Sequence, residues 1–137
     1  MSLPQPALRA RQVDVVVSAG WGKLMTGTLF TAFPNGILNA HPALLPSFPG
    51  PGRRAVRETI EWGAKVSGST IHFLDQETDH GPIVFQEAVP VEEGDSVDSL
   101  HDRIKAVEHR LLPDAVRLQV LGKLHLDGRR VRIDSTP

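Results

Sequence analysis

The sequence contains no cysteine. Disulfide bonds, thiolate metal sites and a cysteine nucleophile are therefore excluded together, and any chemistry must use other side chains. The formal net charge is only -1 at pH 7, which gives no indication of binding to nucleic acid or to a membrane surface. The leader at 1–12 holds no apolar run and predicts neither a signal peptide nor a transmembrane helix. A cytoplasmic protein whose leader is poorly ordered is expected.

Motifs for metal and nucleotide binding are lacking as well. The six histidines form no His-Glu-x-x-His motif and no closely spaced pair on one helical face. Neither Gly-x-Gly-x-x-Gly, nor a Walker-type loop, nor Gly-x-Ser-x-Gly occurs. The sequence therefore predicts no metal site and disfavours nucleotide cofactors and serine hydrolysis.

The hydrophobic pattern predicts one α/β domain that spans 1–137, since a chain of this size buries roughly two-thirds of its unfolded surface in one core. Asp14 to Ala19 is a β-branched run, typical of a strand buried on both sides in a parallel sheet. Further strands are predicted at Gly36 to Asn39, Ser69 to Leu74 and Pro82 to Val91.

Two helices and a hairpin are predicted around these strands. Arg53 to Trp62 has the pattern of a helix that stops at Gly63. The second helix begins behind the N-cap Ser96, carries an apolar stripe, and should end or kink at Pro113. Leu124 to Ile133 alternates around a turn, which indicates a hairpin at the edge of the domain.

Asn39 and His41 lie two positions apart, where a predicted strand passes into the proline-rich loop Pro42 to Gly52. Ligands bind beyond the carboxyl ends of strands in such sheets. An amide and an imidazole there can donate hydrogen bonds to an oxyanion, and one such donor is worth about 3 kcal/mol of transition-state stabilisation. The residues alone leave the alternative open that Asn39 caps a turn and His41 is a polar loop residue.

Asp79 lies in the turn from Thr78 to Pro82, between two predicted strands. A turn aspartate commonly bonds its own backbone, which is the structural interpretation. If the loop folds back toward Asn39 and His41, the carboxylate would instead hold the imidazolium and relay a proton. The choice depends on a long-range contact that the turn itself does not specify.

Two further polar residues lie on surfaces predicted to be buried. His72, in the middle of a strand, is interpreted as a hydrogen-bonded wall residue. Glu108 borders the apolar stripe of the second helix and needs a partner, because burial of an unpaired carboxylate is costly. That partner is either a substrate amine or one of two nearby arginines, Arg103 and Arg110.

Ordered blocks of sequence carry a resemblance to the folate-dependent formyltransferase family. Their order and spacing are more specific than any single block. They are Leu38 to Pro46, Phe48 to Gly50, Gly68 to Phe73, Asp79 to Ile83, and Gln86. The resemblance implies a formyltransferase-type, Rossmann-like and mostly parallel sheet with flanking helices, whose N-terminal half is missing from this sequence.

The resemblance also implies roles for individual residues. Asn39, His41 and Asp79 would be catalytic. 10-formyltetrahydrofolate would be the co-substrate, with no metal, and would lie against Trp21, Lys23, Leu24, Met25, Leu38, Asp75, Glu77 and Thr78. Glu108 followed by His109 is similar to the branch that formylates glycinamide ribonucleotide in purine biosynthesis, where this position contacts the substrate. Small-molecule partners are therefore expected.

Two other functions stay open. One is a folate-binding remnant or structural subunit without turnover, because the glycine-rich turn that would hold the substrate phosphate is missing. Alternatively, water replaces the amine and the protein is a formyltetrahydrofolate hydrolase. Arg53 or Arg54 is a candidate for phosphate contact. Missing strands would also expose a sheet edge, which a second copy of the chain is expected to cover.

Overall fold

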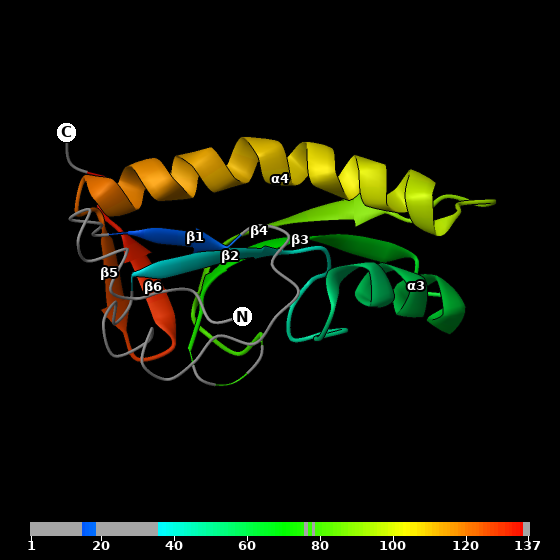
Figure 1. Ribbon diagram of the computed structural model, residues 1–137, viewed down its shortest axis with the longest axis horizontal. Helices are drawn as coiled ribbons and strands as arrows, with labels where there is room; N and C mark the ends of the chain where they lie inside the picture. The colour runs from blue at the N-terminus through cyan, green and yellow to red at the C-terminus, as the bar shows by residue number, and fades with distance from the viewer. Residues whose placement is uncertain (1–14, 19–35, 76, 78, 136–137) are drawn as a thin grey trace, which may run out of the picture.

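A six-stranded sheet forms the centre of this computed structural model, which describes residues 15–18, 36–75, 77 and 79–135. The strand order is β1-β2-β3-β4-β6-β5 (Figure 1). The strands are β1 (Val16–Ser18), β2 (Ile37–His41), β3 (Val66–Phe73), β4 (Ile83–Pro90), β5 (Leu124–Asp127) and β6 (Arg130–Ile133). The described helices are α3 (Gly52–Trp62) and α4 (Val97–Val120).

The described sheet is mixed. β1 pairs with β2 and β4 pairs with β6 in parallel, whereas β2–β3, β3–β4 and β5–β6 are antiparallel. The loops after β3 and β5 are too short for a crossover, so those pairs must be antiparallel. The predicted α/β sheet with flanking helices is confirmed. Val17 of β1 is 41% exposed, so the two-sided burial predicted for the β-branched run is not reached at this position.

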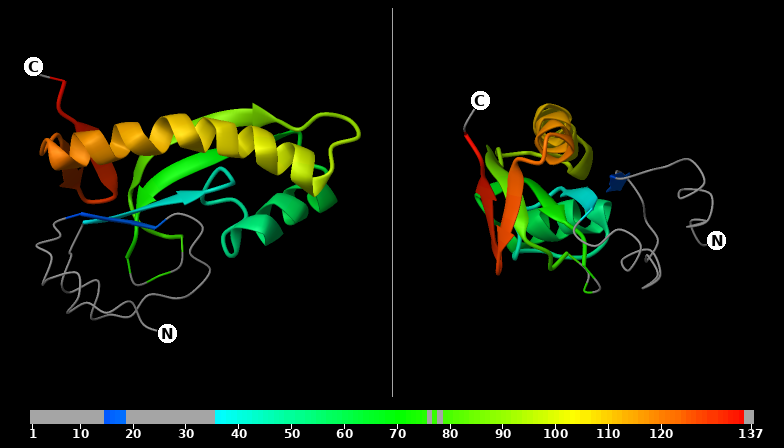
Figure 2. Two further views of the ribbon diagram at one scale, coloured as in Figure 1. Left: turned by 45° about the horizontal axis from the view of Figure 1, so that its top comes forward. Right: turned by 90° about the vertical axis from the view of Figure 1, so that its left-hand side faces the viewer.

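The apolar core lies between the sheet and α4, which runs lengthwise along one face (Figure 2). Its larger cluster consists of Leu38, Ile71, Phe73, Val84, Leu111 and Ala115. A second cluster joins α3 to the start of α4 and consists of Val56, Val89, Leu100 and Ile104. Neither helix of the described ranges has an apolar stretch long enough for a membrane span.

α4 continues through Pro113, where the sequence predicts that it ends or kinks. Pro113 has no N–H and cannot bond to the carbonyl of His109. The apolar stripe nevertheless continues beyond it, because Leu111, Ala115 and Leu118 are all buried. Burial of this stripe against the sheet outweighs the loss of one helical hydrogen bond, so α4 does not end at Pro113. A kink at this position stays a prediction.

The start of α4 is fixed by polar side chains, and the predicted N-cap is confirmed. The Ser96 hydroxyl accepts a hydrogen bond from the Ser99 N–H at 3.0 Å, and the Ser99 hydroxyl accepts one from the Ser96 N–H at 2.9 Å. Asp95 accepts two hydrogen bonds from the Arg103 guanidinium, at 2.8 and 2.7 Å. Arg103 thereby holds the pKa of the Asp95 carboxyl well below its ordinary value.

We expect Asp95→Asn to lower the melting temperature at neutral pH by a few degrees and to reduce the acid sensitivity of the fold. Folding lowers the Asp95 pKa below the unfolded value of about 3.9, so the ionised carboxylate stabilises the fold above that pH. This stabilisation is lost as the pH falls below about 4. Thermal unfolding at neutral and acid pH measures the difference between wild type and variant, which should shrink in acid. A difference that stays constant with pH would contradict the prediction, and Asp114→Asn on the exposed side of α4 is the matched control.

The sheet face opposite α4 carries polar residues at alternate positions. In the β2–β3 pair, Asn39 lies opposite His72, and His41 lies opposite Thr70. Alternate residues of a strand point to the same side, so these four side chains share one face. Leu38, one position before Asn39, packs on the other face under α4. The polar cluster therefore lies on the face of the sheet opposite the apolar core.

Candidate active site

The three residues predicted to be catalytic meet on the face opposite α4. Asn39 and His41 lie at the end of β2, and Asp79 lies in the turn between β3 and β4. That turn folds back over the sheet, so that Asp79 Oδ2 lies 3.6 Å from His41 Nδ1. The side chains of His41 and Asp79 are only 3% and 8% exposed. The long-range contact required for a chemical role of Asp79 is therefore present.

The backbone around Asp79 fixes its carboxylate. Asp79 has a left-handed conformation with φ 52°, which aspartate tolerates better than most residues. Its Oδ2 accepts a hydrogen bond from the Gly50 N–H at 2.6 Å, which ties the turn to the proline-rich loop. A Cβ on Gly81 would lie 1.7 Å from the Phe73 carbonyl oxygen, so the chain passes there without a side chain.

His41 uses its two ring nitrogens differently. Nε2 lies 2.8 Å from the carbonyl oxygen of Phe48, which can only accept, so Nε2 carries the proton and donates. Nδ1 faces Asp79 at a distance longer than a hydrogen bond and stays available to a substrate atom. Phe48 has a positive φ of 50°, an uncommon conformation that is typical of functional sites.

His72 is fully buried and orients Asn39. Its Nδ1 lies 3.0 Å from the Phe73 carbonyl oxygen and donates to it. Burial is the largest cause that lowers the pKa of His72, so the ring is neutral and Nε2 keeps its lone pair. Asn39 Nδ2 donates to that nitrogen at 3.1 Å. The second N–H on Asn39 Nδ2 has no partner among the described residues and is available to a ligand.

The sequence interpretation of His72 as a wall residue misses this link to Asn39. His72 also lies close to Asp79, with 3.8 Å between His72 Nε2 and Asp79 Oδ1. The available signal was the alternation of Thr70 and His72 along one strand, which puts both on one face. His72 lies opposite Asn39 because of the register between β3 and β2. The alternation of residues along β3 does not predict that register.

Thr70 anchors the proline-rich loop beside the site. Its hydroxyl donates to the Ala43 carbonyl at 2.7 Å and accepts from the Leu45 N–H at 3.2 Å and from Gln86 Nε2 at 3.0 Å. Gln86 Nε2 also donates to the Leu45 carbonyl at 2.8 Å. Because Thr70 is fully buried, these hydrogen bonds hold the loop that presents the Phe48 carbonyl to the site.

The residues that the resemblance assigns to folate are only partly described. Those outside the described residues are Trp21, Lys23, Leu24, Met25 and Thr78. Leu38 is fully buried in the core next to α4. Asp75 is half-buried and accepts a hydrogen bond from the N–H of the exposed Glu77 at 2.8 Å. Folate contact by all of these residues stays a prediction.

Glu108 lies half-buried on α4, on the face of the sheet away from the cluster. Its two candidate partners within the protein bind elsewhere, because Arg103 pairs with Asp95 and Arg110 pairs with Glu87. In the part of the chain that the structure describes, Glu108 has no ion pair. Contact between Glu108 and the substrate also stays a prediction.

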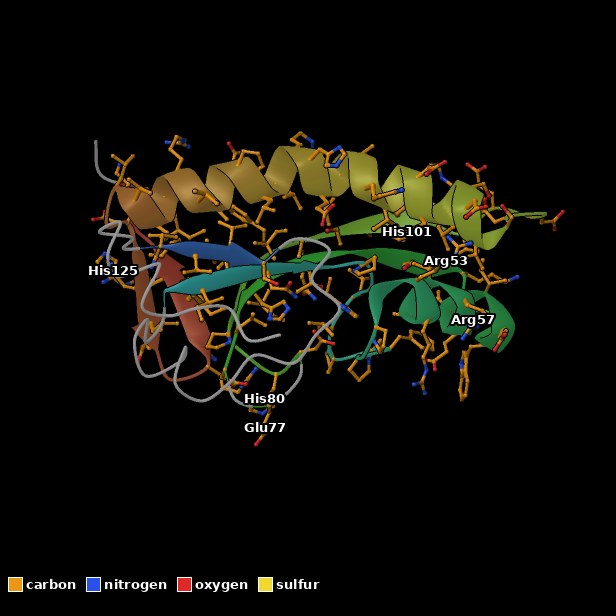
Figure 3. All side chains as sticks on the ribbon, in the orientation of Figure 1. Arg53, Arg57, Glu77, His80, His101 and His125 are labelled. Carbon is orange, nitrogen blue, oxygen red and sulfur yellow. The ribbon has the colours of Figure 1, made fainter. Side chains whose placement is uncertain are left out.

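The two arginines considered for phosphate contact pair with carboxylates on the surface. Arg53 Nη1 lies 2.7 Å from Asp98 Oδ1, and Arg54 Nε lies 2.8 Å from Glu58 Oε1. Figure 3 shows Arg53 on α3, on the side toward the start of α4. Both arginine side chains are more than half exposed, so each pair is screened by solvent and contributes little to stability.

The cluster presents an amide N–H, an imidazole nitrogen and a carboxylate to one region. The first two can stabilise negative charge on a carbonyl oxygen, and the third can accept a proton. Within the described ranges, no group of three or more histidine, aspartate or glutamate side chains could hold a metal ion. The arrangement therefore suits attack of a nucleophile on a carbonyl carbon by side-chain chemistry.

Comparison with known proteins relates most of the chain to one family. Residues 4–116 match the family model described as formyl transferase. The phosphoribosylglycinamide formyltransferase of Mycobacterium tuberculosis (strain CDC 1551 / Oshkosh) is 42% identical over 133 residues, which cover 93% of this chain and 61% of that protein. The chain thus spans less than two-thirds of the length of this relative.

Solved structures share the fold. Glycinamide ribonucleotide transformylase 1 from Symbiobacterium toebii has a TM-score of 0.92 at 51% sequence identity, covering 96% of this chain and 61% of that chain. A formyltetrahydrofolate deformylase from Pseudomonas syringae pv. tomato has a TM-score of 0.87 at 25% identity, covering 95% of this chain and 43% of that chain. The arrangement of strands and helices is therefore common to a transferase and a hydrolase.

Proposed function

Because the chain belongs to the formyl transferase family, we propose that it transfers the formyl group of 10-formyltetrahydrofolate to the amine of glycinamide ribonucleotide in purine biosynthesis. The observation that carries this proposal is the meeting of Asn39, His41 and Asp79 in one nearly buried cluster. Relatives that are named for this reaction, at 42% and 51% identity, support it.

The donors of the cluster fit a formyl carbonyl. The substrate amine attacks the formyl carbon, and the carbonyl oxygen becomes an oxyanion in the tetrahedral intermediate. The Asn39 N–H and a protonated His41 Nδ1 would donate to that oxygen. Nε2 of His41 is already bonded to the Phe48 carbonyl, so Nδ1 is the nitrogen left for this role.

Asp79 completes the transfer by handling protons. The attacking amine must lose a proton, and the folate nitrogen must gain one before it leaves. The Asp79 carboxylate would accept the first proton through water and return it through water to the folate nitrogen, so that the bond from this nitrogen to the formyl carbon can break. It would also keep the imidazolium of His41 in place. Since Oδ2 is 3.6 Å from His41 Nδ1, the two groups interact electrostatically without a direct hydrogen bond. Neither a metal nor a covalent enzyme intermediate is required.

Formyl hydrolysis is the second candidate function. The fold similarity to a formyltetrahydrofolate deformylase favours it as the alternative. The same donors would stabilise the oxyanion, and Asp79 would deprotonate water in place of the amine. A folate-binding remnant without turnover is the third.

The proposal includes the location and the partners of the protein. The protein would be cytoplasmic, and its partners would be small molecules. A second copy of the chain would cover the edge of the described sheet at β1. The exposure of Val17 on that strand supports this association, since apolar edge strands are usually paired or covered.

Formyl release from 10-formyltetrahydrofolate by the purified 137-residue chain tests the proposed function. The absorbance of the folate product is followed with and without glycinamide ribonucleotide. Turnover that requires the amine is the expected result. Turnover without the amine would establish the hydrolase instead. Absence of turnover in both reactions, with folate still bound, would overturn catalysis and favour the remnant.

A further inference from the structure

The hairpin formed by β5 and β6 reaches the turn that carries Asp79. Arg129, at the tip of this hairpin, donates a hydrogen bond from Nη2 to the carbonyl oxygen of His80, 49 positions earlier in the chain. β6 also pairs with β4 directly after the turn, with Ile83 opposite Arg130. The hairpin is thus joined to both the turn and the strand that follows it.

The side chain of His80 closes the same turn from within. Its Nδ1 lies 2.9 Å from Asp75 Oδ2, and its Nε2 lies 3.5 Å from Glu77 Oε2. Figure 3 shows His80 and Glu77 at the outer tip of this turn. Asp75 Oδ1 accepts in addition from the Glu77 N–H. Contacts therefore join the described residues on the two sides of Asp79.

Asp79 depends on the backbone on either side of it. Its left-handed φ and the 2.6 Å hydrogen bond from the Gly50 N–H to its carboxylate depend on how the turn places the residues beside it. Packing of Gly81 against Phe73 fixes the backbone two residues after Asp79. The His80 carbonyl belongs to the peptide between His80 and Gly81, and Arg129 holds its oxygen.

We propose that Arg129 is a positioning residue for Asp79, so that the β5–β6 hairpin is a working part of the site. Arg129 touches no reacting atom and acts through the His80 carbonyl. Its effect on reaction rate rests on the proposed formyl transfer. Its effect on the position of the Asp79 carboxylate does not, because the Gly50 N–H reports that position without any turnover.

Hydrogen exchange of the Gly50 amide in Arg129→Ala tests this directly. Loss of a hydrogen bond from a charged donor should raise the exchange rate of Gly50 about tenfold. The Val91 amide, bonded to the Lys65 carbonyl at the far end of β4, should exchange as in wild type. Unchanged exchange at Gly50, or an equal rise at Val91, would overturn the proposal.

Two further variants separate position from charge. Arg132→Ala removes the same charge from an exposed position of β6 and should leave Gly50 exchange unchanged. Arg129→Lys keeps a donor and should recover part of the protection. A rise in Arg132→Ala as large as that in Arg129→Ala would refute the specific role of Arg129.

The rate of formyl transfer provides the second readout. Arg129→Ala should lower kcat about tenfold and leave the KM for the amine within about twofold, because the carboxylate is displaced and the amine contacts are not. An unchanged kcat together with faster Gly50 exchange would overturn the catalytic consequence. If wild type lacks turnover, the proposed function fails, and the exchange experiment still decides whether Arg129 positions Asp79.

Discussion

Asp79→Asn is expected to slow formyl transfer roughly 10³-fold, within the range for loss of a general acid–base group. Asparagine tolerates the left-handed backbone of Asp79, and its amide oxygen can accept from the Gly50 N–H as the carboxylate does. The variant therefore keeps the shape of the turn but cannot take a proton at neutral pH. Folate affinity should stay nearly that of wild type.

Single-turnover rates and equilibrium binding of 10-formyltetrahydrofolate measure these two quantities separately. Asp127→Asn, a change of the same kind at an exposed position of β5, is the matched control and should alter neither. If Asp79→Asn reduced the rate and the folate affinity by the same factor, Asp79 would have a structural role only.

Asn39→Ala is expected to lower kcat by about 10²- to 10³-fold, as for removal of one oxyanion donor. The substitution removes the N–H that faces the ligand and also the group that donates to His72 Nε2. His72 is fully buried, so its unpaired nitrogen should lower the free energy of unfolding by about 1–3 kcal/mol as well.

Thermal unfolding distinguishes the two effects of Asn39→Ala. His72→Phe also breaks the Asn39–His72 bond but leaves the amide in the site, so it is the matched comparison. The loss of rate in Asn39→Ala should exceed that in His72→Phe at temperatures where both are folded. Equal losses would mean that Asn39 acts by supporting His72 and not as an oxyanion donor.

Local patterns in the sequence predicted most of the described elements. The helix at Arg53 to Trp62, the Ser96 cap and the C-terminal hairpin each follow from residues close together in the chain. The continuation of α4 beyond Pro113 was not predicted, because the local rule considers only the hydrogen bond that a proline removes. Leu118, which follows Pro113, is buried by packing against the sheet, and no local rule predicts that packing. Tertiary packing overrode the local rule there.

The candidate catalytic residues were identified through the order of the family blocks, and their arrangement in space was not predicted. Nothing near Asp79 in the sequence specifies that its carboxylate meets the Gly50 N–H. The link from Asn39 to His72 depends on strand register, and the contact from Arg129 to His80 depends on where a hairpin 49 residues away docks. Long-range geometry of this kind leaves no periodic signal in one sequence.

The left-handed backbone of Asp79 restricts which amino acids evolution could use there. Glycine and asparagine accept that conformation but carry no carboxylate. Glutamate carries the charge, but it lacks the short side chain that bonds locally and makes the conformation inexpensive. Aspartate alone meets both demands. In a screen of all twenty residues at this position, only aspartate would keep full activity, and even Asp79→Glu, which is conservative elsewhere, would be disruptive.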